Sequence, residues 1–122
     1  MDYKLELIIL PVADVDRAKE FYLRAGFNAD HDQTVSDEVR FVQITPPGSA
    51  CSIAFGRGLT AAAPGSVKGL QVVVSDIEEA HSDLSGRGVP VSEIENLAWG
   101  RFVYFADPDG NHWAVQEIVI PQ

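Results

Sequence analysis

The sequence predicts an α+β fold of two tandem β-α-β-β-β modules that form a curved mixed sheet around a shared cup. Three observations support this prediction. Residues 10–27, LPVADVDRAKEFYLRAGF, are repeated in pattern as residues 72–89, VVVSDIEEAHSDLSGRGV; strand-like runs follow each copy; and a stretch of small, uncharged residues separates the halves. One half alone would leave a sheet face bare, so the two halves are expected to share an apolar space.

The repeated segment predicts a strand followed by a helix. Asp14 corresponds to Asp76, and Gly26 corresponds to Gly88 at the same offset. An Asp at the end of an apolar strand can cap the exposed N–H groups of the helix that follows. A Gly suits the left-handed position at which many helices end. We therefore expect one helix between each Asp and its Gly.

Three strand-like runs follow each predicted helix. They cover residues 28–32, 39–45 and 52–55 in the first half, and residues 89–94, 102–106 and 111–119 in the second. The clearest turn between them is the DPDG sequence at residues 107–110, where Pro and Gly suit a type I turn. We expect a single domain over residues 1–122, with module 1 at about 1–59, a linker at about 60–66 and module 2 at about 67–122.

Composition excludes several classes of function. Hydrophobic residues make up 46% and charged residues 22% of the chain, as in ordinary globular domains. The net charge of −9 argues against a nucleic-acid partner, because phosphates need clustered cations and the chain has nine Lys and Arg in all. The single cysteine, Cys51, allows no internal disulfide. Without an apolar run of membrane-spanning length or signal-peptide features, we expect a cytoplasmic protein with no membrane partner.

The duplicated pattern resembles the vicinal oxygen chelate superfamily, which includes glyoxalases, bleomycin-resistance proteins and extradiol dioxygenases. Three motifs carry the resemblance: LPVADVDRAKEFY at residues 10–22, VVVSDIEEA at residues 72–80 and FADPDGNHW at residues 105–113. The resemblance implies the same paired-module fold. It leaves the activity open, because one fold can host many chemistries.

In metal-dependent relatives, the first and last strands of each module supply the metal ligands. The resemblance places these four positions at Leu7, Ala54, Gly69 and Ala114. None of these residues has a donor atom in its side chain, and a transition metal needs three or four N, O or S donors. The resemblance therefore implies a protein without the family's usual metal, and we expect no cofactor.

Strand alternation places further side chains around the cup. His112 and Gln116 have the parity of Ala114, whereas Glu117 points to the opposite face. The cup is then apolar with a few neutral polar groups, as in many small-molecule pockets. The predicted ligand-binding residues are Leu7, Ser52, Ala54, Gln71, Trp99, His112, Ala114 and Gln116.

Trp99 and His112 each allow two interpretations. Trp99 precedes Gly100 in a predicted connection, where it could be a lid that stacks on a flat ligand or a plug over the core. An imidazole titrates near neutral pH, so His112 is a candidate catalytic base. A half-exposed strand residue is the preferred interpretation of His112, because no carboxylate or nucleophile can be placed beside it from the sequence.

Two functions of different classes fit these features. The first is a metal-free homodimer that binds a small organic molecule of aromatic and cationic character, like the drug-sequestering relatives. The second is a metal-independent isomerase or lyase acting on a small carbonyl compound, with His112 as proton shuttle and with Gln71 and Gln116 as oxyanion donors. Binding is favoured because the four expected ligand positions lack donor atoms.

Overall fold

The computed structural model describes residues 1–118, which form two four-stranded sheets and two helices. The predicted α+β class with tandem β-α-β-β-β modules is confirmed. Module 1 contains β1 (Leu7–Ile9), α1 (Val15–Arg24), β2 (Asn28–Thr34), β3 (Arg40–Thr45) and β4 (Ser52–Arg57). Module 2 contains β5 (Leu70–Val74), α2 (Ile77–Gly86), β6 (Glu95–Leu97), β7 (Gly100–Ala106) and β8 (His112–Glu117).

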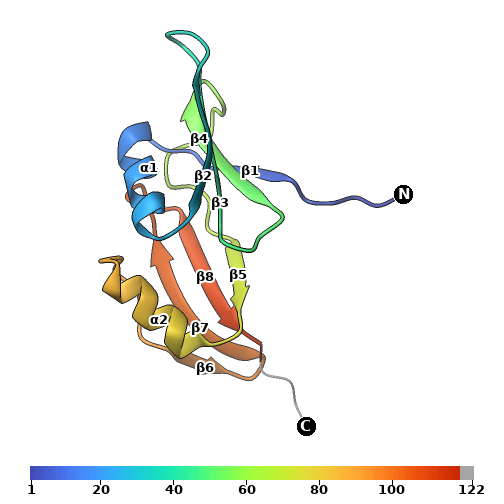
Figure 1. Ribbon diagram of the computed structural model, residues 1–122, viewed down its shortest axis with the longest axis vertical. Coiled ribbons are helices and arrows are strands. Elements are labelled where there is room, and N and C mark those ends of the chain that lie inside the picture. Colours follow the sequence, from blue (N-terminus) through green and yellow to red (C-terminus); the bar gives the residue numbers. More distant parts are fainter. Residues whose placement is uncertain (119–122) are drawn as a thin grey trace.

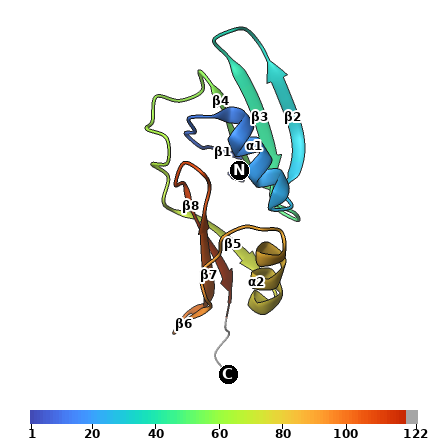
Figure 2. The ribbon, with the colours of Figure 1, turned by 90° about the vertical axis from the view of Figure 1, so that its left-hand side faces the viewer.

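Both sheets have the same topology. The strand order is β1-β4-β3-β2 in module 1 and β5-β8-β7-β6 in module 2. In each sheet the first strand lies at an edge and runs parallel to the last strand, and the other pairs are antiparallel. The modules lie one above the other with both helices on the same side (Figure 1), and the β2–β3 hairpin projects beyond the rest of module 1 (Figure 2).

Each helix begins after the predicted capping aspartate. The Asp14 carboxylate accepts one backbone hydrogen bond from the first turn of α1 at 3.1 Å, and Asp76 accepts two from α2 at 3.0 and 3.1 Å. These contacts satisfy N–H groups that have no partner within the helix. After the helices, Gly26 and Gly88 have φ angles of 94° and 80°, which confirms the predicted left-handed positions. Neither helix within residues 1–118 is long and apolar enough to cross a membrane.

The strands differ from their predicted ranges mainly in module 2. Residues 89–94 form no strand, and the pairing segment is β6, which begins one residue later. The apolar side chains of residues 89–94 pack against the core instead, while the backbone N–H of Ser92 donates to the Tyr104 carbonyl at 3.0 Å. Burial beside β7, rather than strand pairing, explains their apolar character. The predicted last strand also includes Val119, which lies outside the described residues.

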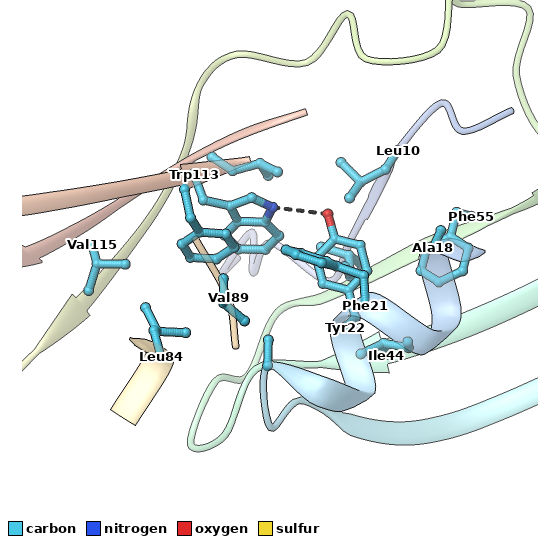
Figure 3. Packing of buried hydrophobic residues seen from close by; sticks show 14 of the residues in the cluster. Leu10, Ala18, Phe21, Tyr22, Ile44, Phe55, Leu84, Val89, Trp113 and Val115 are labelled. Carbon is cyan, nitrogen blue, oxygen red and sulfur yellow. Dashed lines mark hydrogen bonds between the residues drawn. The ribbon is translucent and has the colours of Figure 1, made fainter. Parts of the chain in front are cut away.

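A single core joins the two modules. Trp113 of β8 packs against α1 of the other module, and its indole nitrogen donates to the Tyr22 hydroxyl at 3.0 Å (Figure 3). The same indole stacks on Phe105 with ring centroids 5.7 Å apart and an interplanar angle of 5°. Both Trp113 and Tyr22 are fully buried. The core therefore lies on the helix side of the module 2 sheet.

Candidate functional site

The DPDG turn closes the β7–β8 hairpin and ties the two modules together. The buried Asp107 carboxylate accepts hydrogen bonds from the Tyr22 hydroxyl at 2.8 Å and from the Asn111 amide at 2.8 Å. It also accepts from the backbone N–H groups of Asp109 at 3.0 Å and Asn111 at 2.9 Å. Burial, reinforced by the Asp107 charge, raises the pKa of Tyr22 far above its usual range, so the phenol remains a donor. Asp107 is thus fully engaged in holding the fold.

Glu117 and Arg101 are likewise engaged on the core side of the sheet. The Glu117 carboxylate accepts a hydrogen bond from the backbone N–H of Ile77 at 3.1 Å, at the start of α2. Arg101 donates to Asn96 at 3.1 Å and to Glu78 at 3.2 Å. These contacts occupy the carboxylate of the β8 strand and the one cation of β7, so neither faces the opposite side of the sheet.

The opposite side of the module 2 sheet is called the open face here. Its membership follows from the register: Tyr104 pairs with Ala114, Ala114 pairs with Gln71, and side chains of paired residues lie on one face. Four of the predicted site residues, on β5 and β8, therefore lie together. The open-face residues are Gln71, Val73, Glu95, Leu97, Gly100, Phe102, Tyr104, Ala106, His112, Ala114 and Gln116.

Three of these residues form an aromatic row across β7 and β8. The rings of Phe102 and Tyr104 stack with centroids 5.9 Å apart and an interplanar angle of 6°. Tyr104 and His112 follow with centroids 5.6 Å apart and an angle of 30°. Phe102 is buried at the base of the row, whereas Tyr104 and His112 are half-buried. Such a row offers a flat surface on which a planar molecule can stack.

Sequence reasoning missed Phe102 and Tyr104 as candidate site residues. A signal for both was present in the DPDG turn, because a tight hairpin determines which residues face each other. The turn pairs Ala106 with His112, so counting back by two brings Tyr104 opposite Ala114.

Two glutamines and a backbone carbonyl lie beside the aromatic row. The Gln71 amide nitrogen donates to the Gln116 amide oxygen at 2.5 Å, and the Gln116 nitrogen donates to the Trp99 carbonyl at 3.0 Å. Trp99 lies in the turn between β6 and β7 and is 63% exposed. An indole this exposed does not plug the core. The lid interpretation of Trp99 stays a prediction.

The open face carries little charge. Glu95 is its one charged side chain, and no Lys or Arg belongs to it among residues 1–118. Burial raises the pKa of Tyr104, and the nearby Glu95 carboxylate raises it further by its charge and by a hydrogen bond. The face therefore favours neutral or cationic molecules over anionic ones.

The predicted residues of module 1 lie on a separate sheet. Leu7 pairs with Ser52, and Ala54 pairs with Ile9, on the side of the module 1 sheet away from its helix. The Ser52 hydroxyl lies 2.6 Å from that of Thr45. Leu7 and Ala54 belong to a different sheet from the aromatic row. A pocket of about 250 Å³ at the module junction is lined by both Ser52 and Gln71, where the two groups approach each other.

Leu7, Ala54, Gly69 and Ala114, the four positions predicted for the metal ligands of relatives, have no N, O or S atom in their side chains. Within residues 1–118, no group of three or more His, Cys, Asp or Glu side chains is arranged to hold a metal ion. Ala114 lies between His112 and Gln116 in the row of open-face residues. The lack of a bound metal stays a prediction, and metal analysis of protein purified without chelators would test it.

Two tandem β-α-β-β-β modules share one core, and one face of the module 2 sheet carries an aromatic row. This arrangement defines a paired-module protein. Residues 4–115 match the family model of the Glyoxalase/Bleomycin resistance protein/Dioxygenase superfamily, and the chain belongs to this family.

The chain is also similar to solved structures and to a protein of Bacillus subtilis. TnmS3, an antibiotic binding protein from Streptomyces sp. CB03234, is 32% identical, with a TM-score of 0.85 over 97% of this chain and 98% of that one. A superfamily member from Sphaerobacter thermophilus DSM 20745 is 30% identical, with a TM-score of 0.81 over 95% and 98% of the two chains. The uncharacterized protein YetH of Bacillus subtilis (strain 168) is 24% identical over 109 residues, which cover 87% of this chain and 91% of YetH.

Proposed function

We propose that this protein binds a small planar organic molecule on the open face of module 2 and does so without a metal. The observation that carries the proposal is the row of Phe102, Tyr104 and His112, flanked by the uncharged amides of Gln71 and Gln116. Small-molecule sites are commonly apolar and aromatic with a few polar groups that orient the ligand. The similarity to TnmS3, which binds an antibiotic, supports the same class of ligand here.

We further propose that the preferred guest is cationic or neutral. Glu95 supplies the one formal charge of the open face, and the chain as a whole has a net charge of −9. A carboxylate near a stacked ring attracts a cation and repels an anion. Anionic aromatic compounds of the same size are expected to bind more weakly.

A homodimer would complete this site. Part of the open face is exposed among residues 1–118, where Val73 is 62% exposed. Module 1 has a matching bare face, where Ile9 is 40% exposed. A second copy that lays its module 1 over this face would bring Leu7, Ser52 and Ala54 to the ligand. Cytoplasmic location and the absence of a nucleic-acid partner belong to the same proposal.

Calorimetric titration with proflavine, a flat cationic dye, tests the proposal. We expect saturable binding at micromolar protein concentration, with one site per open face, and weaker binding of an acridine carboxylate. Sedimentation velocity of the same sample should report a dimer. Absence of proflavine binding at these concentrations would contradict the proposed function, and a monomer that binds normally would contradict the shared site.

A second candidate function is a metal-independent isomerase or lyase acting on a small carbonyl compound. The ring contact between Tyr104 and His112, together with the Glu95 carboxylate near Tyr104, favours it because three side chains capable of acid–base chemistry lie on one face. In this version His112 is the proton shuttle, and Gln71 is an oxyanion donor. If such an activity is found, His112→Ala should reduce turnover at least a hundredfold. Unchanged turnover would exclude this mechanism.

A further inference from the structure

A backbone carbonyl determines which side-chain amide atoms on the open face donate hydrogen bonds and which accept them. The Trp99 carbonyl oxygen can only accept a hydrogen bond, so the Gln116 amide must turn its nitrogen toward it, at 3.0 Å. The Gln116 oxygen then faces Gln71, which must turn its own nitrogen toward Gln116, at 2.5 Å. The orientation of both amides therefore follows from one atom that cannot donate.

The two hydrogen bonds that link the Trp99 carbonyl, Gln116 and Gln71 are called the amide chain here, and they depend on Gly100. A Cβ atom at this position would lie 2.8 Å from the Gln116 amide nitrogen and 2.8 Å from the Glu117 carbonyl oxygen. Real Cβ atoms do not approach other heavy atoms so closely. The missing side chain at Gly100 thus lets Gln116 cross the sheet and reach the Trp99 carbonyl.

The Gln71 end of the amide chain remains available to a ligand. Gln71 is exposed, and within residues 1–118 its amide oxygen accepts no hydrogen bond. One N–H of its nitrogen is engaged with Gln116, which fixes the orientation of the amide and leaves the oxygen open to a donor. Glu95, the one charged residue among the open-face residues of the described chain, is an acceptor as well when ionised. A ligand with an N–H or O–H group can therefore pair with the Gln71 oxygen.

We propose that Gln71 determines specificity by accepting a hydrogen bond from a donor on the ring edge of the ligand, with Gln116 as its positioning residue. The ligand class is then a planar aromatic molecule that carries an N–H or O–H group. This inference rests on the proposed function, since it assumes that the ring of the ligand stacks on the row of Phe102, Tyr104 and His112.

A matched pair of probes tests the inference. 2-Naphthol and 2-methoxynaphthalene have the same ring, but only the naphthol can donate a hydrogen bond. We expect the protein to bind 2-naphthol about fivefold more tightly, the effect of one net hydrogen bond. In Gln71→Met this preference should disappear while the affinity for 2-methoxynaphthalene changes less than about twofold. Gln116→Met should reduce the preference too, because Gln71 loses its orientation.

Val35→Met is the control, because it places the same side chain at a position 69% exposed in the connection between β2 and β3, away from the module 2 sheet. It should leave the affinities of both probes and their ratio unchanged. Equal binding of the two probes to the unmodified protein, or a naphthol preference that survives in Gln71→Met, would overturn the inference and leave the proposed function standing. If neither probe nor proflavine binds, the proposed function itself fails.

Discussion

The two faces of the module 2 sheet are made by alternate residues of the same strands but differ in almost every physical respect. On the core face, Trp113 and Asp107 are buried, and the Asp107 carboxylate is fully paired. On the open face, Tyr104 and His112 are half-buried, and the Gln71 amide oxygen accepts no hydrogen bond from the part of the chain that the structure describes. Because strand side chains alternate, one strand can stabilise the fold with one set of residues and present a ligand surface with the other. Stability and binding should therefore be separable by mutation.

The largest effect is expected on the core face. Asp107→Ala removes the acceptor for the Tyr22 hydroxyl, the Asn111 amide and two backbone N–H groups, all within a buried network. We expect a loss of about 4 kcal/mol in the free energy of unfolding, since buried donors left without partners are costly. Urea unfolding followed by tryptophan fluorescence would measure it.

The control for Asp107→Ala is Asp37→Ala, which changes an exposed residue in the connection between β2 and β3. It should alter the free energy of unfolding by less than about 0.5 kcal/mol. A similarly small loss for Asp107→Ala would show that the two modules are held together by other contacts.

Gly100→Ala is expected to affect both faces. Its Cβ would clash with the Glu117 carbonyl and with the Gln116 amide. We expect a loss of about 2 kcal/mol in the free energy of unfolding, together with a loss of the naphthol preference. Gly69→Ala is the matched control, because a Cβ there meets nothing within 4 Å. Equal behaviour of the two variants would refute the explanation given for Gly100.

Tyr104→Ala should act on binding alone. Removing the central ring of the aromatic row is expected to weaken proflavine binding about tenfold, as aromatic stacking contributes on the order of 1 kcal/mol. The free energy of unfolding should change by less than about 1 kcal/mol, because Tyr104 lies outside the core cluster. Tyr3→Ala, at a position 92% exposed, serves as the control and should alter neither quantity. Unfolding of Tyr104→Ala would break the proposed separation of the faces.

The smallest effect is expected in module 1, away from both faces. Arg40 donates to Asp32 at 3.0 and 2.9 Å and Lys19 donates at 2.8 Å, and these contacts hold the pKa of Asp32 well below its usual range. A depressed pKa stabilises the fold above the unfolded value of about 4, and this stability is lost as the pH falls toward the folded pKa. Asp32→Asn should cost about 1 kcal/mol or less from pH 7 to 5, since these side chains are partly exposed.

Urea unfolding of both proteins at several pH values tests this. The difference between Asp32→Asn and the unmodified protein should shrink below about pH 4, where the aspartate of the unmodified protein begins to lose its advantage. A difference that stays constant down to pH 3 would mean that the ion pairs contribute nothing to stability.

The fold was predictable because it is specified by short-range signals that occur twice. Asp14 and Asp76 begin the helices, and Gly26 and Gly88 follow them, as the repeat indicated. The strand predicted at residues 89–94 was wrong, because apolar residues indicate burial but do not distinguish a strand from an irregular segment packed on the core.

The site was only partly predictable. Alternation along β8 correctly separates Gln116 from Glu117, because both side chains belong to one strand. Tyr104 could have been found by counting across the DPDG turn. The link from Gln116 to the Trp99 carbonyl could not, since it depends on a side chain crossing a glycine in a neighbouring strand.

The most direct test of the open face as the ligand site is an NMR titration of the isotope-labelled protein with proflavine. The two tryptophans lie in different surroundings: Trp99 is exposed and its backbone carbonyl accepts from Gln116, whereas Trp113 is buried in the core. Saturable shifts are predicted for the Trp99 indole and for the side-chain amides of Gln71 and Gln116, with little change at the Trp113 indole. Shifts confined to other surfaces, or no shifts at saturating dye, would contradict the account.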